Sequence, residues 1–290
     1  MKQSRLFSTW LGFILGACAA LLVNVAVARA SDDAVVMEEF HQTYPLEANG
    51  RIDLHNINGW VKISSWDRNE VKVDAVKWAY SKERLDEAKI RVDASPSALH
   101  IQTEYPDRNL TFHDDDEDNP ATVDYTLTVP VSARLQDIKL INGSLDMKNI
   151  SGDVEASCIN GKLTAAGLRG RTDLSTINGT LEIAFDRVDA QRRTELKSVN
   201  GSVHVTLPSD TNAEVTASTV HGHIDNDFGL PVDDGRFVGH KLDGRFGNGE
   251  GRVELKNVNG SIDIRRAADG KPPTPVTNLL EPRTDRRSLF

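Results

Sequence analysis

The sequence predicts an all-β protein, and three observations carry that prediction. A nine-residue unit repeats five times without a gap between residues 141 and 185 (INGSLDMKN, ISGDVEASC, INGKLTAAG, LRGRTDLST, INGTLEIAF). Each unit begins with a large aliphatic residue, has glycine third, and then alternates between apolar and polar residues. The unit recurs more loosely around Gly59, Gly201, Gly222 and Gly260. A short period with alternating strands is typical of stacked β-structure.

Within each unit, the alternation defines one strand of about five residues with a buried and an exposed face. The fifth and seventh positions of each unit are predicted to face the core, and Thr172 is the one polar residue at a fifth position. These predicted inward positions are Leu145, Met147, Val154, Ala156, Leu163, Ala165, Thr172, Leu174, Leu181 and Ile183.

The Asn-Gly pairs favour bends in a coil over hairpin tips. Asn-Gly commonly closes two-residue hairpins, but a hairpin here would put Ile141 and Leu145 on opposite faces. If the chain bends at each pair, the leading Ile or Val can point into the corner of the coil. We therefore predict a β-solenoid, a single-stranded β-helix with about 18–22 residues per coil, and keep a two-sheet β-sandwich as the alternative. The predicted structural turns are Asn58, Gly59, Asn142, Gly143, Gly152, Asn160, Gly161, Gly170, Asn178, Gly179, Asn200, Gly201, Gly222, Asn259 and Gly260.

Residues 1–30 have the pattern of a secretory signal peptide: basic residues, an apolar stretch, and Ala28-Arg29-Ala30 before the expected cut. The chain is therefore expected to be exported, to the periplasm or the cell surface, with no membrane span after this peptide is removed. A lipoprotein anchored through Cys18 is the alternative, because Leu15-Gly16-Ala17-Cys18 resembles a lipoprotein processing site.

Three further regions follow the signal peptide. Residues 31–130 are predicted to form a β-rich start of the stack, with one short helix near residues 82–89 for which Ser81 is a suitable N-cap. Residues 131–266 are predicted to form the β-strand-repeat solenoid, in which the glycine-rich insertion 227–251 loops out. Residues 267–290 contain four prolines and no apolar periodicity, which indicates a disordered tail.

Charge and cysteine content exclude some classes of function. The whole chain has a net charge of −9, and residues 1–30 carry three of the basic residues and no acidic ones, so the exported chain carries −12. An acidic surface disfavours nucleic acid and anionic membranes. Cys158 is the only cysteine left after cleavage, so no internal disulfide can form.

Five segments together resemble the bacterial putative-adhesin β-strand-repeat family. They are NINGWVKISSWDRNEVKVDAVK, VDYTLTVPVSARL, the ING units, LPSDTNAEVTASTVHGHIDNDF and FGNGEGRVELKNVNGSIDIRR, and the resemblance covers roughly residues 50–266. It implies a β-helix-like exported domain of unknown function in the cell envelope, and it brings no catalytic or ligand residues with it. Ser151, Arg169 and His221 stand where Asn commonly precedes the turn glycine.

Aromatic residues near the start of the stack are the candidate binding site. Trp60, Trp78 and Tyr80 are predicted by alternation to lie on the face opposite the buried valines, where exposed rings could stack on sugar rings. In the alternative interpretation, these rings cover one end of the stack.

Three other groups of residues have the chemistry of possible sites, but each has a simpler structural interpretation. The run Asp114–Asp118 could hold Ca²⁺, but like charges with no fixed geometry more often form a solvated loop. His221 and His223 alternate along one predicted strand and are interpreted as surface histidines, and Cys158 is interpreted as a small buried residue. No catalytic motif, metal-ligand spacing or cofactor loop occurs in the sequence, so no cofactor or metal is predicted.

These observations predict a non-enzymatic adhesin-like protein that binds an unidentified envelope or extracellular protein or glycan. Two alternatives stay open: a β-helix enzyme that acts on polysaccharide through acids and bases spread over neighbouring coils, and an accessory protein in cell-envelope signalling.

Overall fold

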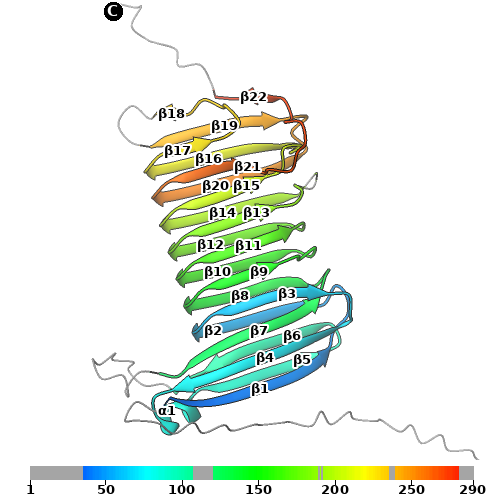
Figure 1. Ribbon diagram of the computed structural model, residues 1–290, viewed down its shortest axis with the longest axis vertical. Helices are drawn as coiled ribbons and strands as arrows, with labels where there is room; N and C mark the ends of the chain where they lie inside the picture. Colours follow the sequence, from blue (N-terminus) through cyan, green and yellow to red (C-terminus); the bar gives the residue numbers. More distant parts are fainter. Residues whose placement is uncertain (1–34, 107–119, 189, 191, 235–238, 281–290) are drawn as a thin grey trace, which may run out of the picture.

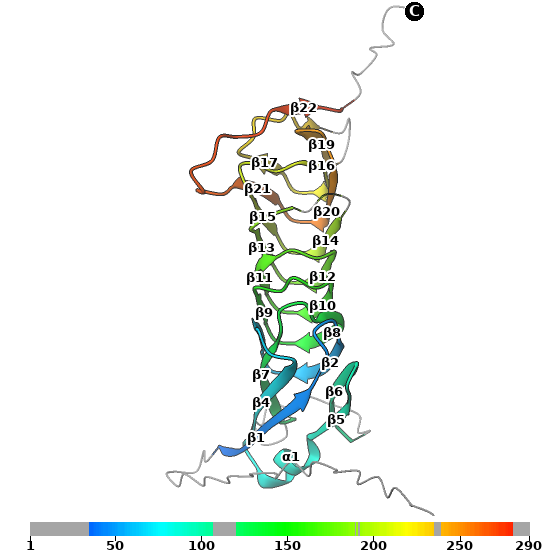
Figure 2. The same ribbon diagram turned by 90° about the vertical axis from the view of Figure 1, so that its right-hand side faces the viewer.

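A computed structural model describes residues 35–106, 120–188, 190, 192–234 and 239–280. The all-β prediction is confirmed, since the strands form two large mixed sheets that face each other (Figures 1 and 2). The expected signal peptide, Cys18 and the run Asp114–Asp118 lie outside the described residues. Within the described ranges, no helix is both long and apolar enough to cross a membrane.

Sheet A has the strand order β1-β4-β7-β3-β9-β11-β13-β15-β21-β17. Its strands are β1 (Val36–Pro45), β3 (Val61–Trp66), β4 (Glu70–Ala79), β7 (Thr122–Pro130), β9 (Leu145–Lys148), β11 (Leu163–Leu168), β13 (Leu181–Phe185), β15 (Val203–Leu207), β17 (Ile224–Asn226) and β21 (Ile262–Arg266).

Sheet B has the order β18-β19-β16-β20-β14-β12-β10-β8-β2-β6-β5, and β22 also pairs with β19. Its strands are β2 (Arg51–Asn58), β5 (Lys89–Ser95), β6 (Ala98–Glu104), β8 (Arg134–Asn142), β10 (Val154–Asn160), β12 (Thr172–Asn178), β14 (Arg193–Asn200), β16 (Ala213–His221), β18 (Asp233–Asp234), β19 (His240–Phe246), β20 (Gly251–Asn259) and β22 (Val276–Asn278).

Consecutive strands from β8 to β15 alternate between the two sheets. Each strand from β8 to β13 pairs in parallel with the strand two places further along the chain, so that Leu145, Leu163 and Leu181 are register partners in β9, β11 and β13. An 18-residue step along the repeat therefore advances the chain by one strand in each sheet. The two sheets agree with the sandwich alternative, and the alternation agrees with a coil.

The inward positions of the repeat form the core between the sheets. All ten predicted positions are buried, including Thr172, whose hydroxyl donates to the carbonyl of Gly170 at 3.1 Å. Burial of one Leu, Ile or Val side chain contributes about 1.5–3 kcal/mol. The polar residues between them face solvent, which keeps each sheet amphipathic.

The expectation that the leading Ile or Val fills the corner is wrong for the Asn-Gly units and for the His221-Gly222 unit. Ile141, Ile159 and Ile177 are 39%, 38% and 45% exposed, and Val199, Val220 and Val258 are 41–42% exposed. The reason is that each sheet B strand stays extended through its Asn, so the residue before the aliphatic one faces inward and the aliphatic one faces out. In the alternate units, by contrast, Ile150 and Leu168 are buried.

At the Asn-Gly corners, successive coils stack backbone on backbone. The amide of Gly143 donates to the carbonyl of Asn160 at 3.0 Å, and a Cβ on Gly161 would lie 1.8 Å from the carbonyl oxygen of Gly143. Gly161 has φ +154°, a region that is essentially limited to glycine. Glycine is therefore needed here for close approach as well as for conformation.

The corner asparagines form a ladder of side-chain amides along the stack. Each donates its Nδ2 to the Oδ1 of the preceding Asn at 2.8–3.0 Å. The ladder consists of Asn58, Asn142, Asn160, Asn178, Asn200 and Asn259, in that spatial order. Asn149 is the one non-glycine residue with positive φ in the described chain, so the ladder residues contribute side-chain hydrogen bonds rather than unusual backbone.

The C-terminal strands depart from the expected order in three ways. First, β20 and β21 insert between earlier strands, which moves β16 and β17 outward in their sheets. Second, the insertion 227–251 does not simply loop out, because β19 pairs antiparallel with β16. Third, the predicted disordered tail includes β22, which pairs with β19 through Phe246 and Val276. Residues 281–290 lie outside the described chain.

The N-terminal part contains the predicted helix as α1 (Lys82–Glu87), slightly shorter than expected. Ser81 is its N-cap, and its side chain accepts from the amide of Arg84 at 3.3 Å. The buried Lys77 Nζ bonds to Glu38 at 3.1 Å and to the carbonyl of Ala88, just after the helix, at 3.2 Å. This lysine therefore fixes α1 against β1 and β4.

Gly161→Ala should destabilise the protein by ~3 kcal/mol or more, because the new methyl group collides with the Gly143 carbonyl in a glycine-only conformation. Gly229→Ala is the matched control: its φ is +70°, but nothing lies within 4 Å of the added Cβ. The control should cost only about 1–2 kcal/mol. Urea unfolding measures both, and equal losses would contradict steric stacking at the corner.

Candidate functional site

Strands β3 and β4 of sheet A, with β7 between them, carry the predicted aromatic residues on the outer face of the sheet. Trp60 precedes β3, Trp78 lies on β4, and Tyr80 directly follows β4. Trp60 and Tyr80 are 36% and 37% exposed, and the rings of Trp78 and Tyr80 meet edge to face at 6.5 Å. The sequence predicted that these rings share a face, and the structure places them there.

Asp124 on β7 anchors two of these residues. Its Oδ1 accepts from the backbone amide of Trp60 at 2.9 Å, and its Oδ2 accepts from the indole Nε1 of Trp78 at 3.2 Å. Lys62 Nζ lies 4.2 Å from the centre of the Trp60 ring, a cation–π contact. We call Trp60, Lys62, Trp78, Tyr80 and Asp124 the aromatic surface.

Sequence reasoning missed Asp124 and Lys62, because both look like ordinary outward residues of alternating strands. Only the pairing of β7 between β4 and β3 shows that Asp124 lies beside both tryptophans. The arrangement offers fixed aromatic faces next to a carboxylate and an ammonium group. Flat rings flanked by hydrogen-bonding groups suit the apolar faces and hydroxyl groups of sugar rings.

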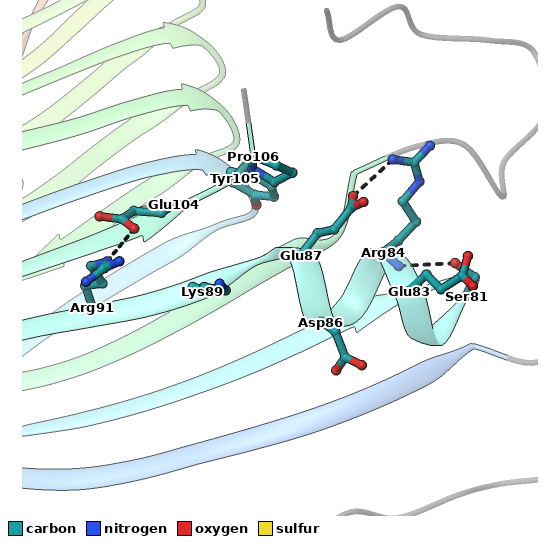
Figure 3. Close-up of a pocket in the computed structure, with 10 residues that line it drawn as sticks. All are labelled: Ser81, Glu83, Arg84, Asp86, Glu87, Lys89, Arg91, Glu104, Tyr105 and Pro106. Atoms are coloured by element: carbon teal, nitrogen blue, oxygen red, sulfur yellow. Dashed lines mark hydrogen bonds and ion pairs between the residues drawn. The ribbon is translucent and has the colours of Figure 1, made fainter. Parts of the chain in front are cut away.

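A cleft of about 780 Å³ lies beside α1, and charged side chains dominate its lining (Figure 3). Two of its cations are paired with lining carboxylates: Arg84 bonds to Glu87 at 3.0 Å, and Arg91 bonds to Glu104. Such internally paired groups do not define a chemistry, so we do not assign this cleft as the site.

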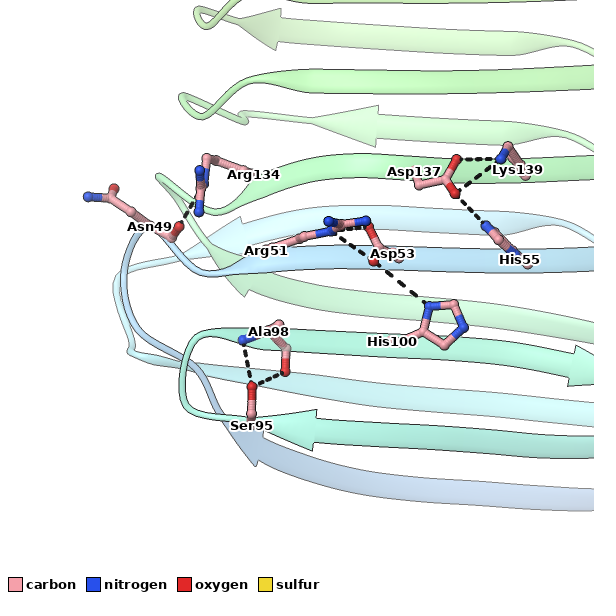
Figure 4. A network of polar contacts seen from close by, with 10 residues as sticks. All are labelled: Asn49, Arg51, Asp53, His55, Ser95, Ala98, His100, Arg134, Asp137 and Lys139. Carbon is pink, nitrogen blue, oxygen red and sulfur yellow. Dashed lines mark hydrogen bonds and ion pairs between the residues drawn. The ribbon is translucent and has the colours of Figure 1, made fainter.

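A polar network covers the outer face of sheet B across β2, β6 and β8 (Figure 4). His55 Nε2 lies 2.8 Å from Asp137 Oδ2, Lys139 lies 2.9 Å from the same carboxylate, and Arg51 bonds to Asp53 at 2.8 Å. Burial raises the pKa of Asp137, but hydrogen bonds from Lys139 and His55 outweigh it and hold the pKa below its usual value. The carboxylate is thus kept ionised.

A second charged cluster crosses β14 and β20 on the same face. Glu195 lies 2.9 Å from Lys197, 3.0 Å from Arg193 and 3.3 Å from Lys256. Hydrogen bonding from Lys197 lowers the pKa of Glu195, and hydrogen bonding from Lys256 lowers that of Glu254. General acid catalysis at neutral pH needs a carboxyl group whose pKa is raised, and these two groups are shifted the other way.

The remaining sequence candidates are separated or shielded. His221 ends β16 and His223 follows the Gly222 corner, so they do not alternate along one strand as expected. His223 bonds instead to Asp225 and Ser261, at 3.2 and 2.9 Å. In the part of the chain that the structure describes, no group of three or more His, Cys, Asp and Glu residues could hold a metal ion.

Comparison with known proteins adds the family. A protein-family profile described as Toastrack DUF4097 matches residues 55–265, well over half of the chain. The chain belongs to this family. The resemblance to the putative-adhesin repeat family that the sequence suggested is thereby confirmed. No curated protein matches the chain.

Three solved structures similar to this Toastrack DUF4097 chain have low sequence identity to it. A putative cell adhesion protein from Clostridium sporogenes ATCC 15579 is 11% identical, with a TM-score of 0.43 and coverage of 79% of this chain and 100% of its own. A putative adhesin from Bacteroides fragilis NCTC 9343 is 12% identical, with a TM-score of 0.28 and coverage of 79% and 97%. A putative lipid binding protein from Parabacteroides distasonis ATCC 8503 is 13% identical, with a TM-score of 0.26 and coverage of 79% and 96%.

Asp124→Ala should loosen the aromatic surface without unfolding the protein, because it removes the acceptor of the Trp60 amide and the Trp78 indole. Proton NMR should show the indole Nε1–H of Trp78 shifting and exchanging faster with solvent. The indole of Trp66 is the internal control, since it donates to the carbonyl of Glu70. An unchanged Trp78 signal would contradict the anchoring role of Asp124.

Cys158 should resist thiol reagents in the folded protein. Its side chain is 1% exposed, its Sγ donates to the Gly143 carbonyl at 3.1 Å, and burial raises its pKa to about 11. Iodoacetamide at pH 8 should label position 158 only after unfolding, as mass spectrometry of the peptide would show. Rapid labelling of the native protein would instead support a reactive thiol.

Proposed function

We propose that this protein is an exported, non-enzymatic, adhesin-like β-solenoid that binds a glycan of the envelope or the extracellular environment through the aromatic surface. The observation that carries the proposal is the grouping of Trp60 and Trp78 around Asp124 on one outer sheet face, with Tyr80 in edge-to-face contact with Trp78. The repeated motifs of this chain supply turn and core positions rather than catalytic groups, which supports it. The signal-peptide pattern of residues 1–30 supports export.

The geometry favours a flat ligand over an enclosed one. The rings lie on the outside of a sheet whose backbone hydrogen bonds are satisfied by β3, β4 and β7, so the surface is rigid before binding. Preorganised aromatic contacts lose little conformational entropy when a ligand docks. A chain of sugar units can lie across such a face, since the apolar side of each sugar ring can stack on an aromatic side chain.

A polysaccharide-acting enzyme is the second candidate, and the charged cluster around Glu195 is the observation that favours it. Arg171, Asp173, Arg193 and Glu195 line a shallow cleft of about 280 Å³ across neighbouring strands. The lowered pKa of Glu195 weighs against an acid role. Loss of polysaccharide cleavage in a Glu195→Gln variant would establish this candidate in place of the first.

Binding to a glycan array, followed by calorimetry with the best glycan, tests the proposal. Trp60→Ala should weaken binding by about two- to tenfold, because stacking on one aromatic ring contributes about 0.5–1.5 kcal/mol. Val131→Ala is the matched control, since Val131 is an apolar residue with 42% exposure outside the aromatic surface.

Circular dichroism should show unchanged folding for both variants. No detectable binding to any glycan at millimolar concentration would overturn the proposal. So would a Trp60→Ala variant that binds as tightly as the Val131→Ala control.

A further inference from the structure

The edge strands of the sheets differ in length and in coverage between the two ends of the molecule. At the C-terminal end, sheet A finishes in the three-residue β17, and the edge of β19 is partly covered by the short strands β18 and β22. At the N-terminal end, sheet A finishes in β1, which has ten residues and only β4 as a strand neighbour within the described chain. A long edge strand with unpaired backbone groups is a template for another strand.

The hydrogen-bond pattern identifies which backbone groups of β1 face outward. The amide of Leu46 donates to the carbonyl of Asn69 at 3.0 Å, and this pair continues the β1–β4 register. In an antiparallel ladder, every second residue faces the same neighbour. The even residues of β1 therefore bond to β4, and the odd residues Met37, Glu39, His41 and Thr43 point their amides and carbonyls away from it.

Pro45 fits this assignment. It is the last odd position of β1, and a residue without an N–H group loses nothing where no strand partner is present. The free part of the edge thus runs from Met37 to Thr43, and it is centred on Phe40.

We infer that β1 pairs antiparallel with β1 of a second copy of this chain, which gives a two-fold symmetric dimer with one continuous sheet A. With Phe40 opposite Phe40, Met37 faces Thr43 of the second copy and Glu39 faces His41. Each facing odd pair exchanges two hydrogen bonds, so four pairs give about eight new bonds.

Charge complementarity selects the second copy and this register. On the outer face of β1, His41 lies 2.7 Å from Asp74 and 3.2 Å from Glu39, in a setting that favours its protonated form. In the inferred register, His41 of each copy lies opposite Glu39 of the other copy, so the dimer contains this pair twice. Shifting the register by two residues toward the N-terminus would instead oppose Glu39 to Glu39.

The inner face of β1 supports the same partner. Val36, Phe40 and Tyr44 pack against the core but stay partly exposed. The second strand would bring the same three apolar side chains alongside and cover them. Helix α1 contacts β1, and Lys77 links Glu38 to the carbonyl that follows the helix. In the inferred register, the Glu38 residues of the two copies lie on opposite sides of the two-fold axis.

Light scattering after size-exclusion chromatography tests the inference on protein produced from its full coding sequence. The protein should be a dimer at 100 µM. Thr43→Pro removes an outward N–H group and leaves the hydrogen bonds to β4 intact. Because the substitution is present in both copies, the dimer loses two hydrogen bonds, and its dissociation constant should rise about tenfold or more.

Glu39→Lys should weaken the dimer similarly, since it places two cations opposite each other. Glu155→Lys is the matched control, because Glu155 is an exposed residue in the middle of sheet B, and it should leave the dimer unchanged. Thermal unfolding monitors the fold of each variant. A monomeric wild-type protein at 100 µM, or a Thr43→Pro dimer as tight as wild type, would overturn the inference.

Disulfide trapping tests the register separately. In a Cys18→Ser background, a mixture of Glu39→Cys and His41→Cys proteins should form a cross-linked dimer on mild oxidation, since facing residues have Cα atoms about 5.5 Å apart. Either protein alone should cross-link poorly. Buried Cys158 does not compete. A mixture that does not cross-link, although both proteins fold and dimerise, would overturn the register.

Discussion

The close stacking of backbone on backbone at the Asn-Gly corners is the constraint on which the structure depends. From Gly59 to Gly260, the amide of each corner glycine donates to the next coil at 2.7–3.0 Å. A Cβ at Gly143, Gly161 or Gly179 would lie within 2 Å of a carbonyl oxygen of the preceding corner. This contact sets the spacing and register of the strands on both sides of the corner, and hence the position of every outward side chain.

The corner also explains two surface features that would otherwise look unrelated. Because each sheet B strand runs extended through its Asn, the asparagine amides meet in a ladder and the preceding aliphatic residues face solvent in a row. The ladder satisfies the side-chain hydrogen bonds at the turn. The row of exposed Ile and Val is thus a geometric consequence of the repeat, although nothing in the described chain covers it.

The sequence predicted the parts of the fold that repeat. The glycine positions, the inward columns and the helix after Ser81 followed from periodicity and capping alone. The direction of the Ile141 side chain could not be predicted, because it depends on whether the strand ends before or after Asn142. If the strand continues through Asn142, Ile141 takes the face opposite to that of Leu140. The insertion of β20 beside β14 is a long-range pairing that local pattern does not encode. The aromatic face was predictable by alternation, but Asp124 was not, since its role depends on β7 lying between β4 and β3.

Hydrogen exchange at the corner glycines tests the central claim most directly. The amides of Gly143, Gly161 and Gly201 donate to Asn160, Asn178 and Asn259 of neighbouring coils, each at 3.0 Å. If corner stacking holds the coils together, these amides should exchange as slowly as those of the core strands, and only when the whole stack opens. Exchange at the rate of solvent-exposed turns such as Gly229, while the strands stay protected, would contradict the account.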